Sequence, residues 1–401
     1  MAAALERKGV NFSTHRYNRS VLRPDYRGGG LVNLMASLAR ARGGDARHAP
    51  LALLPPAEIA GARNLLFVIV DGLGARYLER HGAGGALARH CRGTLTSVFP
   101  STTATAITTS YTGLTPLEHG LTGWFTYFHE AGCVAAPLPF KSRGDQLSLR
   151  DRGVVPESLF PSASIFDALP VRSRVVSYRP ILDSDYNVRH CGRAERIGYD
   201  DLAGFVAACE AAVTSDRERK FVYAYWPQFD ALSHRHGNAS PEVRTHFAEL
   251  DAAFAELLAR LAGTDTAVVA TADHGFMDSM AEDCVELPAA LAPLLRYPLC
   301  GERRVAFCHV HDLQAYLEKA RSLLGECADV RPSGELLAEG WFGAGTPHPR
   351  IAERVGDVAI LMRDRYTLKD WVAGEPRHLH IGNHGGASED EMLIPLIVRQ
   401  A

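Results

Sequence analysis

Short apolar runs bounded by turn residues recur along the chain and predict buried strands. The clearest run extends from Leu65 to Val70 and ends in Asp71-Gly72. An apolar run without polar alternation is typical of a strand that is covered on both faces, as in a parallel sheet. Four further runs have the same character, at residues 174–178, 221–225, 267–271 and 358–362.

Helical patterns lie between these runs. Residues 31–42, 200–213 and 241–262 are helix candidates, and the last begins with Ser240 as a helix cap and Pro241 at the first helical position. Strands that alternate with helices predict an α/β fold in which a central, mostly parallel sheet is flanked by helices. In such folds ligands bind beyond the carboxyl ends of the strands.

Residues 275–375 interrupt this alternation. They contain a proline- and leucine-rich stretch, a strand–helix unit at 305–324 and a glycine-rich turn. We therefore expect an inserted cap subdomain at 275–375. The catalytic α/β core then comprises residues 1–274 and 376–401, and residues 1–60 form an N-terminal extension packed on it.

Composition and charge narrow the class of protein. Hydrophobic residues make up 46% of the 401 positions and charged residues 22%, which is ordinary for a globular protein with a large core. The net charge of -3 gives no electrostatic reason for binding bulk nucleic acid or an anionic membrane. A small anionic substrate is compatible with that charge, because bound metal ions can supply positive charge locally.

The sequence predicts neither a signal peptide nor a membrane-spanning helix. The first 20 residues carry charges at Glu6, Arg7 and Lys8 and have no apolar centre, so we expect no signal peptide. No stretch approaches 18 uncharged apolar residues, so we expect no membrane-spanning helix. The eight cysteines form no CxxC pair, and we expect them to be reduced in a protein of the cytoplasm.

Two predicted strands end in residues that can bind metal. Asp71 precedes a glycine, which lets the backbone turn sharply away while the carboxylate reaches an ion. Asp273 and His274 follow another strand and precede Gly275 in the same manner. An aspartate before a glycine is common in ordinary turns. Adjacent Asp and His side chains on one turn are more typical of a metal site.

Asp230 is a third candidate and follows the run 221–225 closely. Its spacing to His234, Asp-x-x-x-His, can present both side chains to one ion. His236 is a nearby competitor, and the spacing favours His234. The ordinary alternative is a solvated polar turn.

The segment near the C-terminus contributes further histidines. His384 lies in the sequence NHGG, whose glycines permit a loop that approaches a site closely. His378 and His380 alternate on what looks like a strand. We expect these two either to contact substrate or to form one face of that strand.

Hydroxyl groups gather at Ser101-Thr102-Thr103, directly after Pro100. The small residues there suit the start of a helix, whose free N–H groups favour a phosphate. A hydroxyl at such a place becomes a nucleophile if a metal lowers its pKa. The ordinary alternative is a cluster that caps the helix.

The Asp and His candidates divide naturally into two sets of three. Mixed oxygen and nitrogen ligands suit zinc, without excluding manganese or iron. Two ions about 3.5–4 Å apart can stabilise the attacking and the leaving oxygen of an in-line displacement. The pattern therefore predicts a two-metal hydrolase of phosphoryl esters. The ligand candidates are Asp71, Asp230, His234, Asp273, His274 and His384.

These motifs resemble the alkaline phosphatase superfamily and, within it, the type I phosphodiesterase/nucleotide pyrophosphatase family. The resemblance rests on VIVDG, FPSTTATA with GLTPLEHGL, Asp-x-x-x-His, ADHG and NHGG, which extend over residues 68–386. It implies an alkaline-phosphatase-like fold and two zinc ions. The residues implied for one ion are Asp71, Asp273 and His274, and those for the other are Asp230, His234 and His384.

The resemblance also implies that Thr103 is the nucleophile, because it lies ten residues before Gly113 of GLTPLEHG, as the nucleophile of the family does. The chain departs from the family pattern nearby. Thr102 stands in place of a lysine, and residues 104–106 replace Phe-Pro-Asn. Trp124 stands where the family typically has an asparagine that contacts a phosphoryl oxygen. A tryptophan could stack there on an aromatic leaving group or pack against the protein, and we expect packing.

We therefore expect a dinuclear-zinc hydrolase that cleaves phosphodiester or pyrophosphate bonds through a covalent phosphothreonine. Its substrate would be a small phosphorylated molecule such as a nucleotide. Hydrolysis of phosphonates or phosphomonoesters on the same site stays open, whereas a sulfatase is disfavoured because no CxPxR motif lies near Thr103. A non-catalytic metal-binding protein is the alternative from another class, although such a descendant should lose ligands or nucleophile first. The sequence indicates no oligomeric state.

Overall fold

The computed structural model describes residues 21–375 and 377–400, so the N-terminal stretch in which we expected no signal peptide lies outside the described residues. Its centre is a seven-stranded sheet, in which the strands from β9 to β7 run parallel and β18 pairs antiparallel with its two neighbours. The predicted α/β fold with a mostly parallel sheet is confirmed. The spatial order is β2 (Cys91–Thr96), β18 (Leu393–Gln400), β9 (Thr266–Thr271), β1 (Asn64–Val70), β8 (Lys220–Trp226), β6 (Arg172–Tyr178) and β7 (Glu195–Tyr199).

Four of the five apolar runs form strands of this sheet, namely β1, β6, β8 and β9. Of these, β1, β8 and β9 are buried along their whole length. The fifth run forms β15 (Val358–Met362), which belongs to a separate, four-stranded sheet. An apolar run indicates that a strand is buried, but it carries no information on which strand it pairs with.

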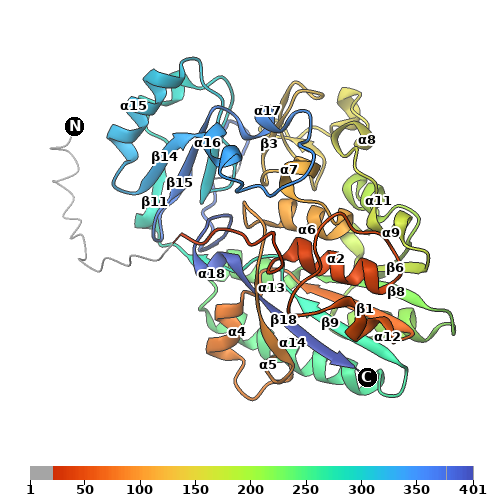
Figure 1. Cartoon of the computed structure of the whole chain (residues 1–401). Helices are drawn as coiled ribbons and strands as arrows, with labels where there is room; N and C mark the ends of the chain where they lie inside the picture. Colours follow the sequence, from red (N-terminus) through yellow and green to blue (C-terminus); the bar gives the residue numbers. More distant parts are fainter. Residues whose placement is uncertain (1–20, 376, 401) are drawn as a thin grey trace.

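Helices cover both faces of the large sheet (Figure 1). The helices α12 (Leu202–Thr214) and α14 (Pro241–Arg260) pack together on the face where Val68 and Val70 of β1 point. On the opposite face lie α2 (Leu31–Ala41) and α6 (Thr103–Thr112), where the hydroxyl of Tyr223 in β8 lies 2.9 Å from that of Ser110 in α6. The expected cap of α14 is present, since Ser240 Oγ accepts a hydrogen bond from Val243 N.

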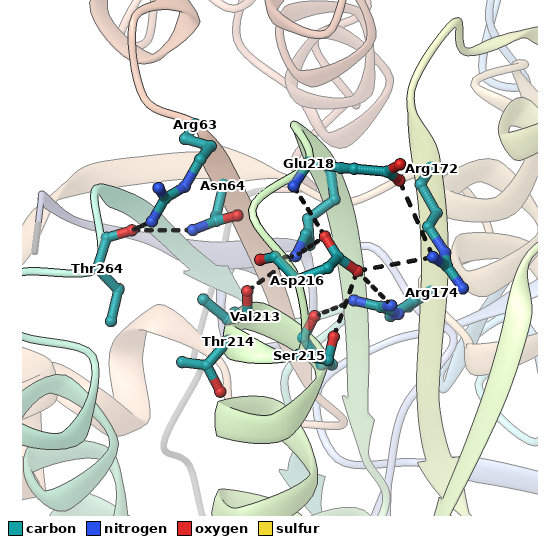
Figure 2. A network of polar contacts seen from close by, with 12 residues as sticks. Arg63, Asn64, Arg172, Arg174, Val213, Thr214, Ser215, Asp216, Glu218 and Thr264 are labelled. Atoms are coloured by element: carbon teal, nitrogen blue, oxygen red, sulfur yellow. Dashed lines mark hydrogen bonds and ion pairs between the residues drawn. The ribbon is translucent and has the colours of Figure 1, made fainter.

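A polar network ties the strands together at their amino ends (Figure 2). The side chain of Lys220 is fully buried, and its Nζ lies 2.6 Å from Asp216 Oδ1. Arg174 Nη2 donates to Asp216 Oδ2 at 2.8 Å, and Asn64 Nδ2 donates to the carbonyl of Thr264 at 2.9 Å. A buried ammonium group needs such a carboxylate partner. The charged residues at this end of the sheet therefore stabilise the fold. A ligand is expected at the opposite end, where the strands have their carboxyl ends.

A second, smaller sheet lies apart from the first (Figure 1, upper left). It is antiparallel throughout and has α15 (Leu313–Leu324) and α16 (Ser333–Ala338) beside it. The predicted strand–helix unit at 305–324 corresponds to its second strand and α15. This sheet falls inside the expected cap at 275–375, whose boundaries stay a prediction. Its strand order is β12 (Cys300–Gly301), β13 (Val305–Cys308), β15 and β14 (Ala328–Pro332).

Short elements complete the described chain. The eight cysteines are free thiols. Among the described residues, no helix combines the length and the apolar character that crossing a membrane requires. The remaining helices are α3 (Pro56–Ala60), α4 (Ala75–His81), α5 (Ala86–Arg89), α7 (Pro116–His119), α8 (Pro156–Leu159), α9 (Ile165–Ala168), α10 (Arg179–Leu182), α11 (Asp185–Cys191), α13 (Gln228–His236), α17 (Ile351–Val355) and α18 (Glu389–Met392). The remaining strands are β3 (Thr126–Phe128), β4 (Cys133–Ala136), β5 (Lys141–Ser142), β10 (Met277–Asp278), β11 (Cys284–Glu286), β16 (Thr367–Lys369) and β17 (Gly382–Asn383).

Candidate metal centre and cavity

Three aspartates converge at the carboxyl ends of three neighbouring strands. Asp71 follows β1 directly, Asp273 follows β9, and Asp230 lies in the first turn of α13 just after β8. Because β9, β1 and β8 are adjacent and parallel, their ends bring the three carboxylates to one place. His384 comes from a different segment of the chain. It directly follows β17, which pairs with β10.

The six predicted ligands form two groups of three. Within each group, one ligand atom per residue lies within 4.8 Å of the others. The first group is buried and the second is partly buried. His236, the competitor of His234, belongs to neither group among the described residues. The first group is Asp71, Asp273 and His274, and the second is Asp230, His234 and His384.

The three histidines are oriented in the same way by backbone carbonyls. A carbonyl oxygen only accepts, so in each ring Nδ1 carries the proton and Nε2 presents a lone pair. The Nε2 atoms of His234 and His384 lie 3.1 Å apart. Two lone pairs at this distance repel, whereas a shared cation would attract both. The carbonyl partners are Gly275 O for His274 (3.1 Å), Gly382 O for His234 (2.9 Å) and Ser101 O for His384 (3.3 Å).

Each aspartate keeps one buried oxygen that has no hydrogen-bond partner among the described residues. These atoms are Oδ1 of Asp71, Oδ1 of Asp230 and Oδ2 of Asp273. The other oxygen of Asp71 accepts from the hydroxyl of Tyr225, and Asp273 Oδ1 accepts from two backbone N–H groups at 3.0 Å each. Buried polar atoms rarely lack a partner. One oxygen oriented by the protein and one left free is the arrangement expected of a metal ligand.

The charges of the site also favour bound cations. Burial, together with the neighbouring carboxylates, raises the pKa of Asp71 and Asp230. Burial lowers the pKa of His234 to about 4 and also lowers the pKa of His274 and His384. The site thus gathers three carboxylates and three neutral imidazoles, and divalent cations would compensate this negative charge.

The hydroxyl of Thr103 lies beside the first group. Thr103 is the first residue of α6, and its Oγ1 is 3.1 Å from His274 Nε2. The other two candidate hydroxyls are engaged elsewhere. Ser101 Oγ donates to a backbone carbonyl at 2.7 Å, and Thr102 Oγ1 donates to Glu302 Oε1 at 2.5 Å.

A cavity of about 440 Å³ opens beside Thr103 and the second group. Trp124 lines this cavity and is 38% exposed, so the packing we expected for it is not what the structure has. His378 and His380 also line the cavity, but they lie in an irregular segment, and the expected strand is wrong. Two alternating histidines carry no information on a partner strand. Among the described residues, no strand pairs with the segment of His378 and His380. The His380 ring lies 4.3 Å from the ring of His234.

Three residues of the site were not found from the sequence. Tyr225 lies near the carboxyl end of an apolar strand, where the sequence predicts a core residue. Glu302 and Arg303 lie in a charged turn between β12 and β13. From the sequence alone, such a turn is expected on the solvated surface. Glu302 Oε1 accepts from the backbone N–H of Trp124 at 2.8 Å, and burial raises the pKa of its carboxyl to about 7. No spacing in the sequence indicates these contacts, because they depend on how distant segments meet.

The contact of Tyr225 with Asp71 leads to a prediction about cation affinity. Removing the hydroxyl in Tyr225→Phe frees Asp71 Oδ2 and loosens the orientation of the carboxylate. We expect the affinity of the first group for zinc to fall about ten- to hundredfold. Calorimetric titration of zinc into chelator-treated protein measures this affinity.

Tyr223→Phe is the matched control. Tyr223 lies on the same strand and its hydroxyl contacts Ser110 instead of a candidate ligand. Equal zinc affinity in the wild type and Tyr223→Phe, with a lower affinity in Tyr225→Phe, is expected. A Tyr225→Phe protein that binds zinc as tightly as the wild type contradicts the role of this hydroxyl.

Known proteins share both sequence patterns and architecture with this chain. A family model described as type I phosphodiesterase / nucleotide pyrophosphatase matches residues 65–135 and 169–387. No curated protein sequence matches the chain. Murine ectonucleotide pyrophosphatase/phosphodiesterase 5, as an inactive variant in complex with AMP, superposes with a TM-score of 0.61 at 17% identity, over 83% of this chain and 87% of that one. Phosphonoacetate hydrolase from Sinorhizobium meliloti, in complex with phosphonoacetate, superposes with a TM-score of 0.60 at 18% identity, over 84% of this chain and 90% of that one.

Proposed function

The chain belongs to the type I phosphodiesterase/nucleotide pyrophosphatase family of hydrolases, and we propose that it cleaves phosphodiester or pyrophosphate bonds. It would use two divalent metal ions and form a covalent phosphothreonine at Thr103. One observation carries the proposal. The Thr103 hydroxyl lies 3.1 Å from a ligand atom of the first group, His274 Nε2, and the cavity beside it reaches all three residues of the second group. A phosphorus atom in this cavity would have the nucleophile at one side and both groups within reach.

We propose zinc for both ions, with manganese or iron as compatible substitutes, because the ligands mix oxygen and nitrogen donors. When bound, the two cations would lower the pKa of the Thr103 hydroxyl and stabilise negative charge on the attacking and leaving oxygens. The free carboxylate oxygens and the facing imidazole nitrogens support this assignment. The ligands are Asp71, Asp273 and His274 for one ion and Asp230, His234 and His384 for the other.

In the first chemical step, the Thr103 hydroxyl loses its proton to solvent and its Oγ1 forms a bond to phosphorus. The bond between phosphorus and the leaving oxygen breaks on the opposite side. The leaving oxygen takes the electron pair, and it is released as phosphate or, after taking a proton from solvent, as the free alcohol. The phosphoryl group is then attached to Thr103.

The start of α6 can hold the phosphoryl oxygens during this step. The first backbone bond inside the helix runs from Thr105 N to Thr102 O at 3.1 Å. The N–H groups of Thr103 and Ala104 have no acceptor among the described residues, and such donors at a helix start favour an anion. We propose that they provide part of the contact that an asparagine provides in the family, where this chain has Trp124.

In the second step, the oxygen of a water molecule attacks the phosphorus of the phosphothreonine. The bond between phosphorus and Thr103 Oγ1 breaks, and Oγ1 regains a proton. The phosphoryl product leaves with the water oxygen. The nucleophile is thereby restored for the next turnover.

Phosphonate hydrolysis is the second candidate. The same attack by Thr103 on a phosphonate would break a bond from phosphorus to carbon, and carbon would leave with the electron pair and take a proton. The likeness to the phosphonoacetate-bound enzyme favours this reading, and the likeness to the AMP-bound protein favours a nucleotide ester. In both cases the partner is a small phosphorylated molecule.

A substrate panel tests the proposed function. The full chain, reloaded with zinc or manganese after chelation, is assayed with bis(4-nitrophenyl) phosphate, the 4-nitrophenyl ester of thymidine 5′-monophosphate, 4-nitrophenyl phosphate and phosphonoacetate. We expect kcat/KM for the better diester to exceed that for the monoester and the phosphonate by about tenfold or more. A leading monoester or phosphonate would move the assignment to that reaction. Absence of hydrolysis across the panel, with two ions bound, contradicts the proposed function.

A further inference from the structure

Two arginines and one lysine line the cavity outside the two ligand groups. They are Arg143, Arg303 and Lys369, and they share the cavity wall with Thr103 and Trp124. Whether each of them already has an acidic partner decides whether it is free to bind a substrate.

Arg143 and Lys369 are neutralised within the protein. The guanidinium of Arg143 lies 2.6 Å from a carboxylate oxygen of Asp370 and 2.7 Å from one of Glu375, and its side chain is 2% exposed. Lys369 Nζ lies 3.1 Å from Glu375 Oε2. Two carboxylates thus compensate two cations in a closed network, which holds the wall of the cavity together.

Arg303 is different. Within the part of the chain that the structure describes, no carboxylate lies within ion-pair distance of its guanidinium, and the hydrogen bond of its side chain is donated by Nη2 to the carbonyl of His378 at 3.1 Å. The backbone carbonyl of Arg303 accepts from Leu368 N at 2.8 Å, which fixes the turn that carries it. Arginine stays protonated in such surroundings. A permanent positive charge therefore lines the cavity, and most of its N–H groups have no acceptor among the described residues.

Among the described residues, the neighbouring Glu302 makes its hydrogen bonds elsewhere and forms no ion pair with Arg303. Its Oε1 accepts from Thr102 Oγ1 at 2.5 Å and from Trp124 N at 2.8 Å. The carboxyl group of Glu302 is thereby directed at the start of α6, whereas the Arg303 side chain is tied to the segment of His378. The two side chains serve different parts of the cavity wall.

We propose that Arg303 binds a second anionic group of the substrate, a carboxylate or a phosphate attached a few bonds from the reacting phosphorus. This inference rests on the proposed function, because it takes the reacting phosphorus to lie at Thr103. A guanidinium offers parallel N–H groups that match either anion in a bidentate contact. A cavity of about 440 Å³ lies in the range that accommodates small ligands of this kind. The preferred substrates are therefore small phosphorus compounds with an acidic substituent.

Three diesters that differ only in a remote charge test this assignment. The probes are 4-nitrophenyl phenyl phosphate and its derivatives with a carboxylate or a phosphonate on the phenyl ring, so that nitrophenolate leaves in every case. Arg303→Met keeps an unbranched apolar stem at this position and removes the charged guanidinium group. We expect its kcat/KM to fall about tenfold or more for the charged esters, through KM, and less than about twofold for the unsubstituted ester. Arg303→Lys should recover part of the loss, since it keeps the charge.

Arg363→Met is the matched control, because Arg363 is exposed, lies in the same part of the chain and donates to a single backbone carbonyl, that of Gly325, at 3.0 Å. It should leave all three values unchanged. A loss in Arg303→Met that is equal for the three esters, or no loss at all, overturns the proposal. A loss confined to one charged ester identifies the anion as carboxylate or phosphate-like.

A binding measurement separates this inference from the proposed function. Calorimetry with phenylphosphonate and its carboxylated derivative, on metal-loaded Thr103→Ala protein, needs no turnover. The carboxylate should improve the affinity about tenfold or more, and the gain should disappear when Arg303→Met is added. If the wild type hydrolyses no ester, the proposed function fails, while this comparison still decides the role of Arg303. An equal affinity for both ligands in the Thr103→Ala protein overturns the inference.

Discussion

We expect the Thr103→Ala variant to lose turnover by about a thousandfold or more while it retains two metal ions per chain. The substitution removes the Oγ1 atom that would form the bond to phosphorus. The hydroxyl is not among the six candidate ligands, so the cations should still bind. Thr103 is the first residue of α6, where alanine is compatible with the helix.

The neighbouring hydroxyls cannot easily replace it. Ser101 Oγ donates to a backbone carbonyl at 2.7 Å in a buried hydrogen bond, and Thr102 Oγ1 donates to Glu302 at 2.5 Å in a partly buried one. Each hydroxyl would have to break its hydrogen bond to reach a substrate. Breaking such a bond costs about 1–3 kcal/mol for each group left unsatisfied. The residual rate of Thr103→Ala should therefore reflect slow attack by water.

Steady-state rates, metal analysis and acid quenching check this prediction together. Thr112→Ala is the control, since Thr112 lies in the last turn of the same helix and its hydroxyl contacts the carbonyl of Thr108 at 2.7 Å. Mass spectrometry of acid-quenched wild type should find a phosphoryl group on Thr103, and none in the variant. Turnover of Thr103→Ala within about tenfold of the wild type would show that another group attacks phosphorus.

The convergence of the aspartates could be predicted from the sequence because it follows from the sheet. Asp71, Asp230 and Asp273 each follow an apolar run, and parallel strands place their carboxyl ends at one edge. The order of the strands could not be predicted. The pairing of β9, β1 and β8 as direct neighbours is what brings the three carboxylates within reach of one another.

The glycines beside His384 made it a ligand candidate, but its assignment to the group of Asp230 and His234 was implied by the resemblance alone. His384 is separated from the other ligands by the whole expected cap, so no local spacing connects it to them. In the structure, the pairing of Met277 in β10 with Asn383 in β17 brings its loop back to the segment that follows Asp273. The carbonyl of Ser101 then orients its ring. Both contacts depend on the tertiary fold.

The pattern of hydrophobic and polar positions did not indicate the residues whose role depends on one contact in the folded chain. Tyr225 has the periodicity of a core residue, and Arg303 that of a solvated turn. The sequence also did not predict β18, because Pro395 is its third residue and proline is rare within a sheet. The strand β2, which pairs with β18, is an edge strand of the sheet. The register of the pairing between β18 and β2 shifts after Leu396.

We expect Asp273→Asn to reduce the metal content from two ions per chain toward one and to lower turnover by about a thousandfold. The amide can still accept the backbone N–H groups of Gly72 and His274, which lie 3.0 Å from Asp273 Oδ1. It replaces the free Oδ2 by a group without negative charge, which is a poor ligand for a divalent cation. The local backbone is therefore retained while the first group loses one of its two carboxylates.

The stability of the metal-free protein should change in the opposite direction. Burial and the carboxylates of Asp230 and Asp273 raise the pKa of Asp71, which means that the ionised cluster opposes folding at neutral pH. Removing the charge of Asp273 relieves this repulsion, so the chelated variant should have a higher Tm than the chelated wild type. Added zinc should raise the Tm of the wild type more than that of the variant, because a cation stabilises only the state that binds it.

Metal analysis, together with scanning calorimetry with and without chelator, distinguishes a metal-binding role of Asp273 from a purely structural one. Asp283→Asn is the control, since Asp283 follows Asp273 on the same segment and lies 3.3 Å from Arg365 instead of in a ligand group. It should leave the metal content and the turnover unchanged. If Asp273 merely held its turn in place, Asp273→Asn would keep two ions and the turnover of the wild type, because its amide can accept the same two backbone N–H groups. Two retained ions, with no rise in the Tm of the chelated protein, would remove Asp273 from the metal centre, and the repulsion among three buried carboxylates would then need another explanation.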